Sequence, residues 1–213
     1  MGKLKVLCVH GYRQNDTVFR EKTGAFRKLV KKHIDFHFIS APHVIPEEHN
    51  EARPAPEQER GWWFSKPEKS YRALDETDVC IGFDDSLQLI VREFETNGPF
   101  DGILGFSQGA SFVSLLCTLK RNPKYRLDFK FAIIVAGFKS LLSAHRPMYE
   151  EPIDCPSFHT VGESDAVIPS QSSEDLQSAF IGPVVYRHSG GHYMPASPQL
   201  RTAITEFLSP FLT

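Results

Sequence analysis

One serine of this sequence stands in a setting that could activate it as a nucleophile. Residues 105–109 read Gly-Phe-Ser-Gln-Gly, a G-x-S-x-G pattern with Ser107 at its centre. An apolar run at 102–106 predicts a strand that leads into it, and residues 110–119 predict a buried helix after it. Glycines on both sides allow the sharp strand–turn–helix connection that holds a serine hydroxyl above the edge of a sheet. An ordinary tight turn is the alternative, but the context favours a nucleophile elbow.

A serine hydroxyl is a weak nucleophile at neutral pH, so a base must lie beside it. In hydrolases with this connection, an acid and then a histidine follow the serine along the chain. His192 follows a Ser-Gly-Gly sequence that suits entry into a crowded site, and His188 is the alternative base. Their spacing of four is that of a metal pair on a helix, but Gly190 and Gly191 disfavour a helix, so no metal site is expected.

The acid should lie between the serine and the histidine, after a strand. Asp165 meets this condition best, because it closely follows a predicted strand at 157–161, and Glu163 is the second choice. A carboxylate there would hold His192 in one tautomer and stabilise its protonated form. A turn or helix-capping role for Asp165 is compatible with the same sequence.

Acyl transfer also needs N–H donors for the oxyanion of the tetrahedral intermediate. The residue after the nucleophile and an early loop usually supply them, which points to the main-chain N–H groups of Gln108 and Tyr12. Tyr12 follows a predicted strand at 4–9. His10 in the same loop is expected to shape the loop rather than to act as a base.

Three adjacent aromatic residues, Trp62, Trp63 and Phe64, are predicted to line an acyl pocket, with core packing as an equally weighted alternative. Such a pocket would favour long linear acyl or alkyl chains, because each buried CH₂ group contributes roughly 0.8 kcal/mol. Arg13, near the oxyanion loop, is the predicted contact for a polar head group.

Strands that alternate with helices must position these groups. The spacing of apolar residues predicts strands at 4–9, 36–39, 102–106, 129–136, 157–161 and 184–187, and helices at 17–32, 79–97, 110–119, 172–180 and 198–212. This alternation indicates an α/β fold with a mostly parallel sheet covered by helices on both faces. Residues 41–70 contain five prolines and are predicted to form a lid-like insertion in a single domain, 1–213.

The composition and charge of the chain argue against nucleic-acid binding and membrane insertion as functions. The chain has 213 residues with 24 Lys and Arg against 26 Asp and Glu, a net charge of −2 that argues against a nucleic-acid partner. No apolar run is long enough for stable membrane insertion, and the N-terminus does not resemble a signal peptide, so a cytoplasmic location with possible nuclear access is expected. The cysteines show no C-x-x-C pair and are predicted to be reduced; they are Cys8, Cys80, Cys117 and Cys155.

Several motifs together resemble the FSH family of serine hydrolases. They lie at 10–15, 61–64, 98–110, 162–169 and 189–192, within a resemblance that covers residues 4–208. The resemblance implies an α/β-hydrolase fold and hydrolysis of carboxylic esters, with thioesterase activity in related members. Carried over by motif, it implies Ser107, Asp165 and His192 as the triad. The segment 47–60 matches poorly, so specificity that depends on it is not carried over.

The sequence therefore predicts a serine carboxylesterase that acts on a small-molecule ester through an acyl-enzyme, without a cofactor. A thioesterase acting on carrier-protein or coenzyme A thioesters is the alternative within the same chemistry. A binding module with a hydrolase fold but no turnover is the alternative of another class. A peptidase fits less well, because 213 residues leave no room for a large cap domain.

Overall fold

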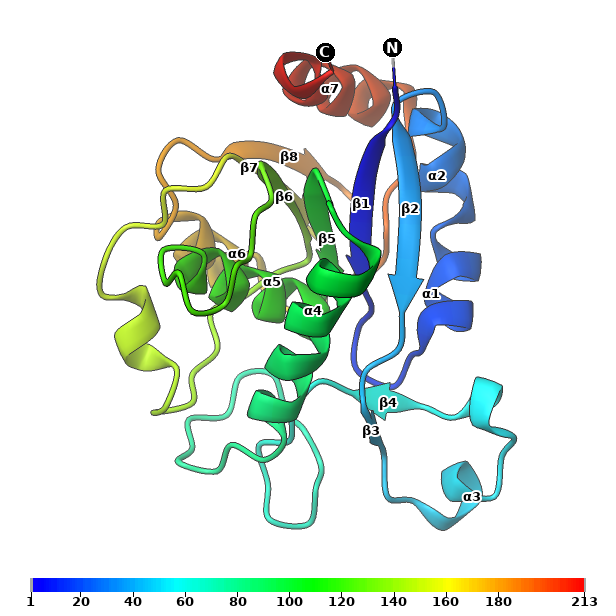
Figure 1. The fold of residues 1–213 in the computed structure, drawn as a ribbon, viewed down its shortest axis with the longest axis vertical. Coiled ribbons are helices and arrows are strands. Elements are labelled where there is room, and N and C mark those ends of the chain that lie inside the picture. Colours follow the sequence, from blue (N-terminus) through cyan, green and yellow to red (C-terminus); the bar gives the residue numbers. More distant parts are fainter. Residues whose placement is uncertain (1, 213) are drawn as a thin grey trace.

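A six-stranded sheet forms the centre of the molecule (Figure 1). The structure, a computed structural model, describes residues 2–212. In the order β2-β1-β5-β6-β7-β8, every pair of neighbouring strands is parallel. The strands are β1 (Leu4–Val9), β2 (Ile34–Ile39), β5 (Gly102–Phe106), β6 (Phe131–Val135), β7 (Ser157–Gly162) and β8 (Val184–His188). All residues of β5 and β6 are buried, as expected for central strands covered on both faces.

Helices cover both faces of the sheet, and each face has its own hydrophobic core. Helices α1 (Asp16–Lys22), α2 (Gly24–Val30) and α7 (Pro198–Leu208) pack on one face. Helices α4 (Phe83–Asn97), α5 (Gln108–Leu119) and α6 (Ser170–Gln177) pack on the other. The predicted α/β class with a mostly parallel sheet is confirmed. No helix between residues 2 and 212 is both long and apolar enough to span a membrane.

The helix predicted at 17–32 is two helices, which is a correction. The chain breaks at Thr23, whose hydroxyl donates to the carbonyl of Phe19 at 2.8 Å, and Gly24 then begins α2. A threonine hydroxyl that bonds back to the preceding turn favours a local bend, and a following glycine weakens helix continuation. Asn15 caps the first helix by accepting the N–H of Val18 at 2.8 Å.

The predicted insertion has structure of its own. It contains β3 (His43–Val44) and β4 (Arg60–Gly61), which pair antiparallel, with α3 (Glu48–Glu51) and a 3₁₀ turn at Ala55–Glu57 between them. Two further 3₁₀ turns lie at Arg146–Tyr149 and Ser209–Phe211. In Figure 1, β1 and β2 run from the end of the molecule that holds both termini toward this insertion. The insertion therefore lies at the edge of the sheet where the parallel strands end.

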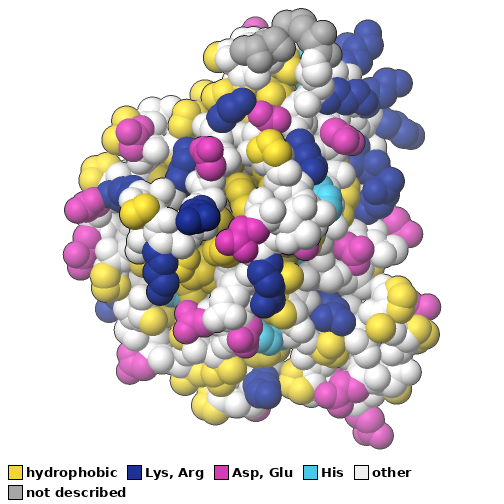
Figure 2. Space-filling view, in the orientation of Figure 1, with side chains coloured by type: hydrophobic (Ala, Val, Ile, Leu, Met, Phe, Trp, Pro, Cys, Tyr) yellow, Lys and Arg dark blue, Asp and Glu magenta, His cyan; other side chains and the backbone are white. Residues whose placement is uncertain are grey.

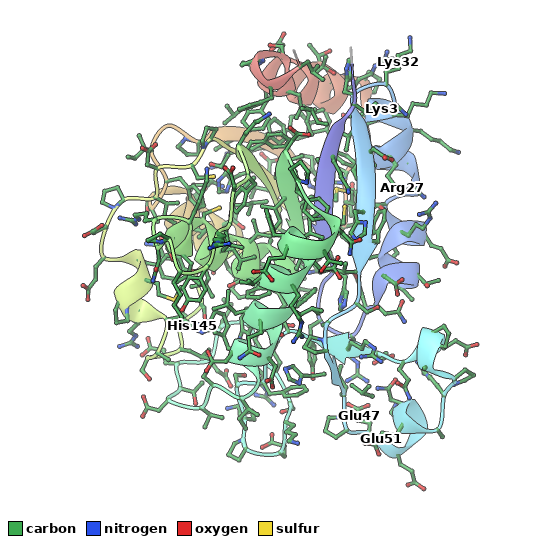
Figure 3. The ribbon with its side chains drawn as sticks, viewed as in Figure 1. Lys3, Arg27, Lys32, Glu47, Glu51 and His145 are labelled. Carbon is green, nitrogen blue, oxygen red and sulfur yellow. The ribbon has the colours of Figure 1, made fainter. Side chains whose placement is uncertain are left out.

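The near-zero net charge conceals a local concentration of basic side chains on the surface. Basic side chains gather beside β2, where a groove is lined by residues that include Lys3, Arg20, Arg27, Lys28 and Lys31 (Figure 2). Figure 3 labels members of this basic region beside α2, and labels Glu47 and Glu51 on the insertion.

The four cysteines are free, as predicted, and three of them are buried.

Candidate active site

Ser107 occupies the turn between β5 and α5 with a left-handed backbone. Its φ is +54°, and its N–H donates to the carbonyl of Val135 at 3.0 Å. The flanking glycines are required by close backbone approach: a Cβ at Gly105 would lie 2.4 Å from the oxygen of Gly109, and one at Gly109 would lie 2.3 Å from the oxygen of Val9. The G-x-S-x-G pattern therefore forms the strained elbow that exposes a serine hydroxyl.

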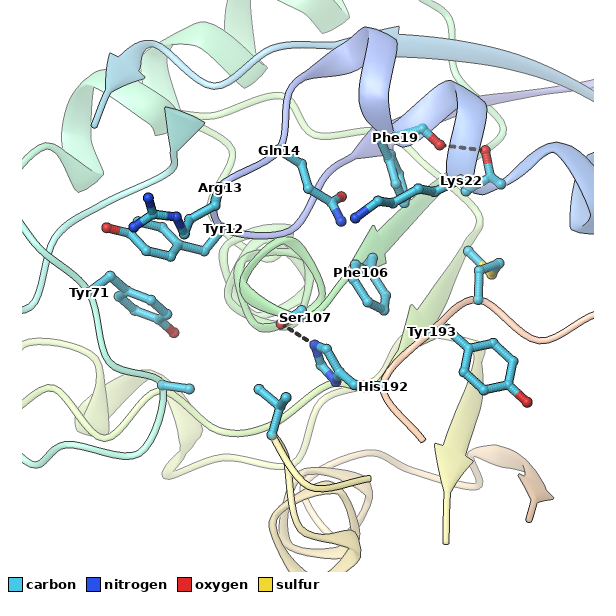
Figure 4. A pocket seen from close by; sticks show the side chains of 14 residues that line it. Tyr12, Arg13, Gln14, Phe19, Lys22, Tyr71, Phe106, Ser107, His192 and Tyr193 are labelled. Atoms are coloured by element: carbon cyan, nitrogen blue, oxygen red, sulfur yellow. Dashed lines mark hydrogen bonds between the residues drawn. The ribbon is translucent and has the colours of Figure 1, made fainter. Parts of the chain in front are cut away.

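Ser107, His192 and Asp165 form one continuous chain of hydrogen bonds. The Ser107 hydroxyl lies 2.9 Å from His192 Nε2, drawn as a dashed line in Figure 4. His192 Nδ1 lies 2.7 Å from Asp165 Oδ2, which is consistent with Nδ1–H donating to the carboxylate. The carboxylate side chain is only 2% exposed, whereas the imidazole is 18% exposed. A shielded acid, a partly open base and a serine thus lie in the order that acyl transfer requires.

Asp165 combines the two roles that the sequence left open. Its Oδ2 faces His192, while its Oδ1 accepts the main-chain N–H groups of Val167 and Ile168, both at 2.8 Å. The turn after β7 therefore fixes the carboxylate from behind. Because both oxygens have partners, the carboxylate cannot rotate without losing hydrogen bonds.

The loops that carry Asp165 and His192 are fastened to each other. Ser164 donates its hydroxyl to the carbonyl of Ser189 at 2.8 Å and its N–H to that of Gly190 at 3.1 Å. A Cβ at Gly162 would lie 2.5 Å from the oxygen of Gly191, so the two backbones touch. The glycines before His192 thus permit contact between the two loops.

The second choices for acid and base lie outside the chain of hydrogen bonds. Glu163 is exposed to solvent, and only its main chain pairs with His188. His188 packs its ring against Tyr193, 5.2 Å away between ring centres, and partial burial lowers its pKa. Neither side chain reaches Ser107 through a described hydrogen bond.

The two predicted oxyanion donors belong to the residue after the serine and to Tyr12, which lines the same pocket as Ser107. Gln108 is the first residue of α5, so its N–H has no acceptor within the helix. The N–H of Tyr12 makes no hydrogen bond to any group in residues 2–212, although those of its neighbours Gly11 and Arg13 do. Both N–H groups are therefore available to a ligand.

No sequence pattern predicted a role for the side chain of Gln108, which is fully buried. Its Oε1 accepts the N–H of Trp62 at 3.0 Å, and its Nε2 donates to the carbonyl of Trp63 at 2.8 Å. One amide thereby joins the start of α5 to the segment that follows β4. Only the three-dimensional contact shows this role, because the partners are about 45 residues apart.

A pocket of about 540 Å³ opens above Ser107 and His192 (Figure 4). Its wall combines aromatic and aliphatic side chains with a few polar ones. Its other lining residues are Tyr12, Arg13, Gln14, Phe19, Lys22, Thr23, Tyr71, Ala73, Phe106, Val167, Tyr193 and Met194. The volume is within the usual range for a small-molecule site.

The prediction that Trp62, Trp63 and Phe64 line this pocket is wrong. They are 0%, 0% and 2% exposed and belong to the protein interior. Trp62 donates its Nε1–H to the carbonyl of His10 at 2.8 Å, and both tryptophans pack against Phe112. Core packing, the alternative interpretation, describes these three residues. The apolar wall is formed instead by other residues, such as Phe106, which immediately precedes the serine.

Arg13 does line the pocket, but its charge is already paired. Its guanidinium donates two hydrogen bonds of 2.7 Å to Glu47 and forms an ion pair of 2.7 Å with Glu59. The hydrogen bond to Glu47 raises the pKa of Arg13 further above its ordinary value. Arg13 therefore fastens the insertion to the loop after β1, and its predicted contact with a polar head group stays a prediction.

This architecture is that of an α/β hydrolase. The sheet is parallel, the serine lies in the turn between β5 and α5, and the acid and histidine follow β7 and β8. The family described as Serine hydrolase (FSH1) matches residues 1–204, and the chain belongs to this family. The enzyme class predicted from the sequence, a serine hydrolase, is thereby confirmed.

Similar proteins agree with this assignment. "Esterase OVCA2" of Xenopus tropicalis is 45% identical over 218 residues, covering 99% of this chain and 94% of that protein. Among solved structures, SOBER1 of Arabidopsis thaliana has a TM-score of 0.64 at 16% identity and covers 100% of both chains. The esterase PE8 has a TM-score of 0.63 at 21% identity and covers 99% of this chain and 94% of that one. Both structural similarities concern the fold.

Proposed function

We propose that this protein hydrolyses carboxylic esters through an acyl-enzyme formed on Ser107. The observation that carries the proposal is the unbroken Ser107–His192–Asp165 chain of hydrogen bonds at the floor of an apolar pocket. The family and the esterases similar to this chain support the same class of reaction.

The contacts assign a role to each group in the first half of the reaction. His192 Nε2 removes the proton of the Ser107 hydroxyl as the oxygen attacks the ester carbonyl. The Asp165 carboxylate stabilises the resulting imidazolium through Nδ1–H. The N–H groups of Gln108 and Tyr12 stabilise the oxyanion, since neither has another acceptor among the described residues.

The second half reverses the proton transfers. Protonated His192 gives its proton to the leaving alcohol, which departs and leaves the acyl group on Ser107. Neutral His192 then takes a proton from water as the water attacks the acyl carbonyl. Collapse of this second intermediate returns the proton to Ser107 and releases the carboxylic acid.

The pocket wall supports substrates with linear acyl or alkyl chains. Phe19 and Phe106 stack with ring centres 6.2 Å apart, and Tyr12 and Tyr71 lie 5.2 Å apart. All four line the pocket. Each methylene buried against such a wall contributes roughly 0.8 kcal/mol, an upper limit of about fourfold in kcat/KM per added carbon.

The test is a series of p-nitrophenyl esters from acetate to dodecanoate, with Ser107→Ala as the blank. We expect kcat/KM to rise with chain length until the pocket is filled and then to level off. Thioesters with the same acyl groups separate esterase from thioesterase activity through the ratio of kcat/KM values. A folded wild-type protein that turns over neither series would contradict the proposal in favour of a binding module.

A further inference from the structure

Two polar side chains point into the pocket on its α1 side. They are Gln14, from the loop after β1, and Lys22, from the last turn of α1. Figure 4 shows the ends of both side chains directed into the space beside Ser107. An amide NH₂ group and an ammonium group both present hydrogen-bond donors, so together they suit an acceptor that carries negative charge.

The orientation of Gln14 is fixed by the loop that holds it. The residue is only 7% exposed, and its Oε1 accepts the N–H of Gly11 at 3.2 Å. The amide Nε2 is therefore turned toward the pocket, and within residues 2–212 no acceptor partners it. A side chain more than nine-tenths buried thus offers two unused donors to whatever occupies the pocket.

Lys22 supplies a positive charge that the protein itself does not neutralise. Among the described residues, no carboxylate forms an ion pair with its ammonium, and no Asp or Glu lines the pocket. Arg13, the other cation in the wall, differs in this respect, because Glu47 and Glu59 occupy it. Of the two lysine and arginine side chains that line the pocket within residues 2–212, Lys22 is therefore the one left to meet a ligand.

An apolar path connects these donors to the nucleophile. Phe106 immediately precedes Ser107, and Phe19 lies one helical turn before Lys22. Their rings are stacked with centres 6.2 Å apart, and both line the pocket. A ligand that reached from Ser107 to Lys22 would cross a hydrocarbon wall and end at two hydrogen-bond donors.

We propose that Gln14 and Lys22 form an anion subsite, and that the preferred esters carry a carboxylate or phosphate group separated from the ester by a short aliphatic segment. The inference rests on the proposed ester hydrolysis at Ser107 and specifies its substrate class. Lys22 and Gln14 determine specificity here and take no part in the proton transfers. The anionic group can belong to the acyl or the alcohol portion, and the test separates the two.

Two matched pairs of substrates test the subsite. The acyl pair is p-nitrophenyl pentanoate against the mono-p-nitrophenyl ester of glutaric acid, and the alcohol pair is propyl butanoate against 2-carboxyethyl butanoate. We expect the anionic member of one pair to have the higher kcat/KM in the wild type. Lys22→Met should lower the anionic-to-neutral ratio about tenfold, the size expected for one charge-assisted hydrogen bond. Raising NaCl should lower the wild-type ratio as well.

Matched variants separate the subsite from general effects of charge. Lys28→Met removes an exposed lysine that lines the groove beside β2 and not the pocket, so it should leave the ratio unchanged. Gln14→Glu keeps an acceptor for Gly11 but replaces the two donors with a negative charge, so it should disfavour the anionic ester selectively. Neutral-ester turnover in this variant reports whether the oxyanion loop is intact.

The inference is overturned if the ratio in both pairs is the same in the wild type and in Lys22→Met while neutral esters are hydrolysed. Binding to Ser107→Ala provides a readout that does not depend on turnover. By titration calorimetry, this variant should bind glutarate more tightly than pentanoate, and the added Lys22→Met change should remove the difference. Equal binding of the two acids would overturn the subsite. Loss of all hydrolysis with this binding preference intact would contradict only the proposed function.

Discussion

In residues 2–212, two chains of hydrogen bonds link a potential nucleophile through a histidine to a second side-chain oxygen, and only the first has the groups that nucleophilic catalysis needs. In the first, Ser107 and Asp165 flank His192 at 2.9 and 2.7 Å. In the second, the Cys80 sulfur lies 3.6 Å from His145 Nε2, and Ser140 Oγ lies 2.8 Å from His145 Nδ1. Each chain thus has a potential nucleophile, an imidazole and an oxygen that orients it.

The difference lies in the oxygen and in the surroundings. His145, labelled in Figure 3, is 2% exposed and packs against Trp63 and Phe83. This burial lowers the pKa of His145 to about 4. Burial and the nearby Asp84 raise the pKa of Cys80 to about 11. A hydroxyl cannot balance an imidazolium as the Asp165 carboxylate can, so the second chain stays neutral near pH 7.

The comparison shows that distance alone does not identify an active site. A nucleophile within hydrogen-bond reach of an imidazole becomes reactive where a carboxylate supports the imidazolium and a pocket admits a substrate. The first chain has both features. The second has an imidazole enclosed by aromatic rings and a hydroxyl in place of the acid.

Replacing the potential nucleophile of each chain should separate the two chains most strongly. Ser107→Ala should lower kcat for a p-nitrophenyl ester by about 10⁴-fold or more, because the attacking oxygen is lost. Cys80→Ser should leave kcat within about twofold. Thermal unfolding of both variants checks that the fold persists. If Ser107→Ala were as active as the wild type, Ser107 would not be the nucleophile.

The carboxylate that distinguishes the first chain can be removed with little change in shape. Asp165→Asn should lower kcat by about 10³- to 10⁴-fold, because the imidazolium loses its countercharge and the favoured tautomer changes. Glu163→Gln is the matched control on the same loop and should have little effect. A larger loss of kcat from Glu163→Gln than from Asp165→Asn would show that Asp165 is not the acid of the triad.

The thiol of Cys80 in the second chain should react slowly. A pKa raised from 9.0 to about 11 means that the thiol form dominates until the pH approaches about 11. At pH 7 the folded protein should therefore react with iodoacetamide at Cys80 about 10²-fold more slowly than the unfolded protein does. Peptide mass spectrometry after timed quenching gives the rate. Equal rates in the folded and unfolded protein would show that the fold does not suppress thiolate formation at Cys80, and a faster rate in the folded protein would show activation.

The buried His145 should make the free energy of unfolding depend on pH, and this is the smallest of the expected effects. The pKa of His145 is lowered from 6.5 to about 4 in the folded state, so the unfolded state binds a proton more readily between these values. Acidification from pH 7 to pH 5 should therefore favour unfolding, by about 1–2 kcal/mol for one such residue. Urea titrations at both pH values measure this loss. His145→Gln should reduce the loss, and the exposed His49→Gln should not.

The sequence predicted those features that short local patterns determine. Ser107, Asp165 and His192 each follow a strand of the parallel sheet, and parallel strands bring such residues to one edge. The break at Thr23 was not predicted, because the 3.6-residue pattern of apolar side chains continues through it. Local patterns thus located the site but not every element boundary.

Features that depend on contacts between distant residues were not predictable. The aromatic residues at 62–64 were predicted to line the pocket. In the structure they are buried, and the side chain of Gln108 forms hydrogen bonds with their backbone. The sequence does not show that Arg13 is ion-paired. Its partners Glu47 and Glu59 come from the Pro-rich insertion, more than 30 residues further along the chain. Periodicity contains no information about such partners, because it describes neighbours along the chain.

Labelling with a fluorophosphonate probe is the most direct test of Ser107 as the nucleophile, because the probe reacts only with an activated nucleophile. Wild-type protein and Ser107→Ala would be treated at neutral pH, and the adduct located by peptide mass spectrometry. The proposed triad predicts an adduct on Ser107 in the wild type, none on Ser140 or Cys80, and none in the variant. An adduct on another residue, or none in folded wild-type protein, would contradict the assignment of Ser107 as the nucleophile.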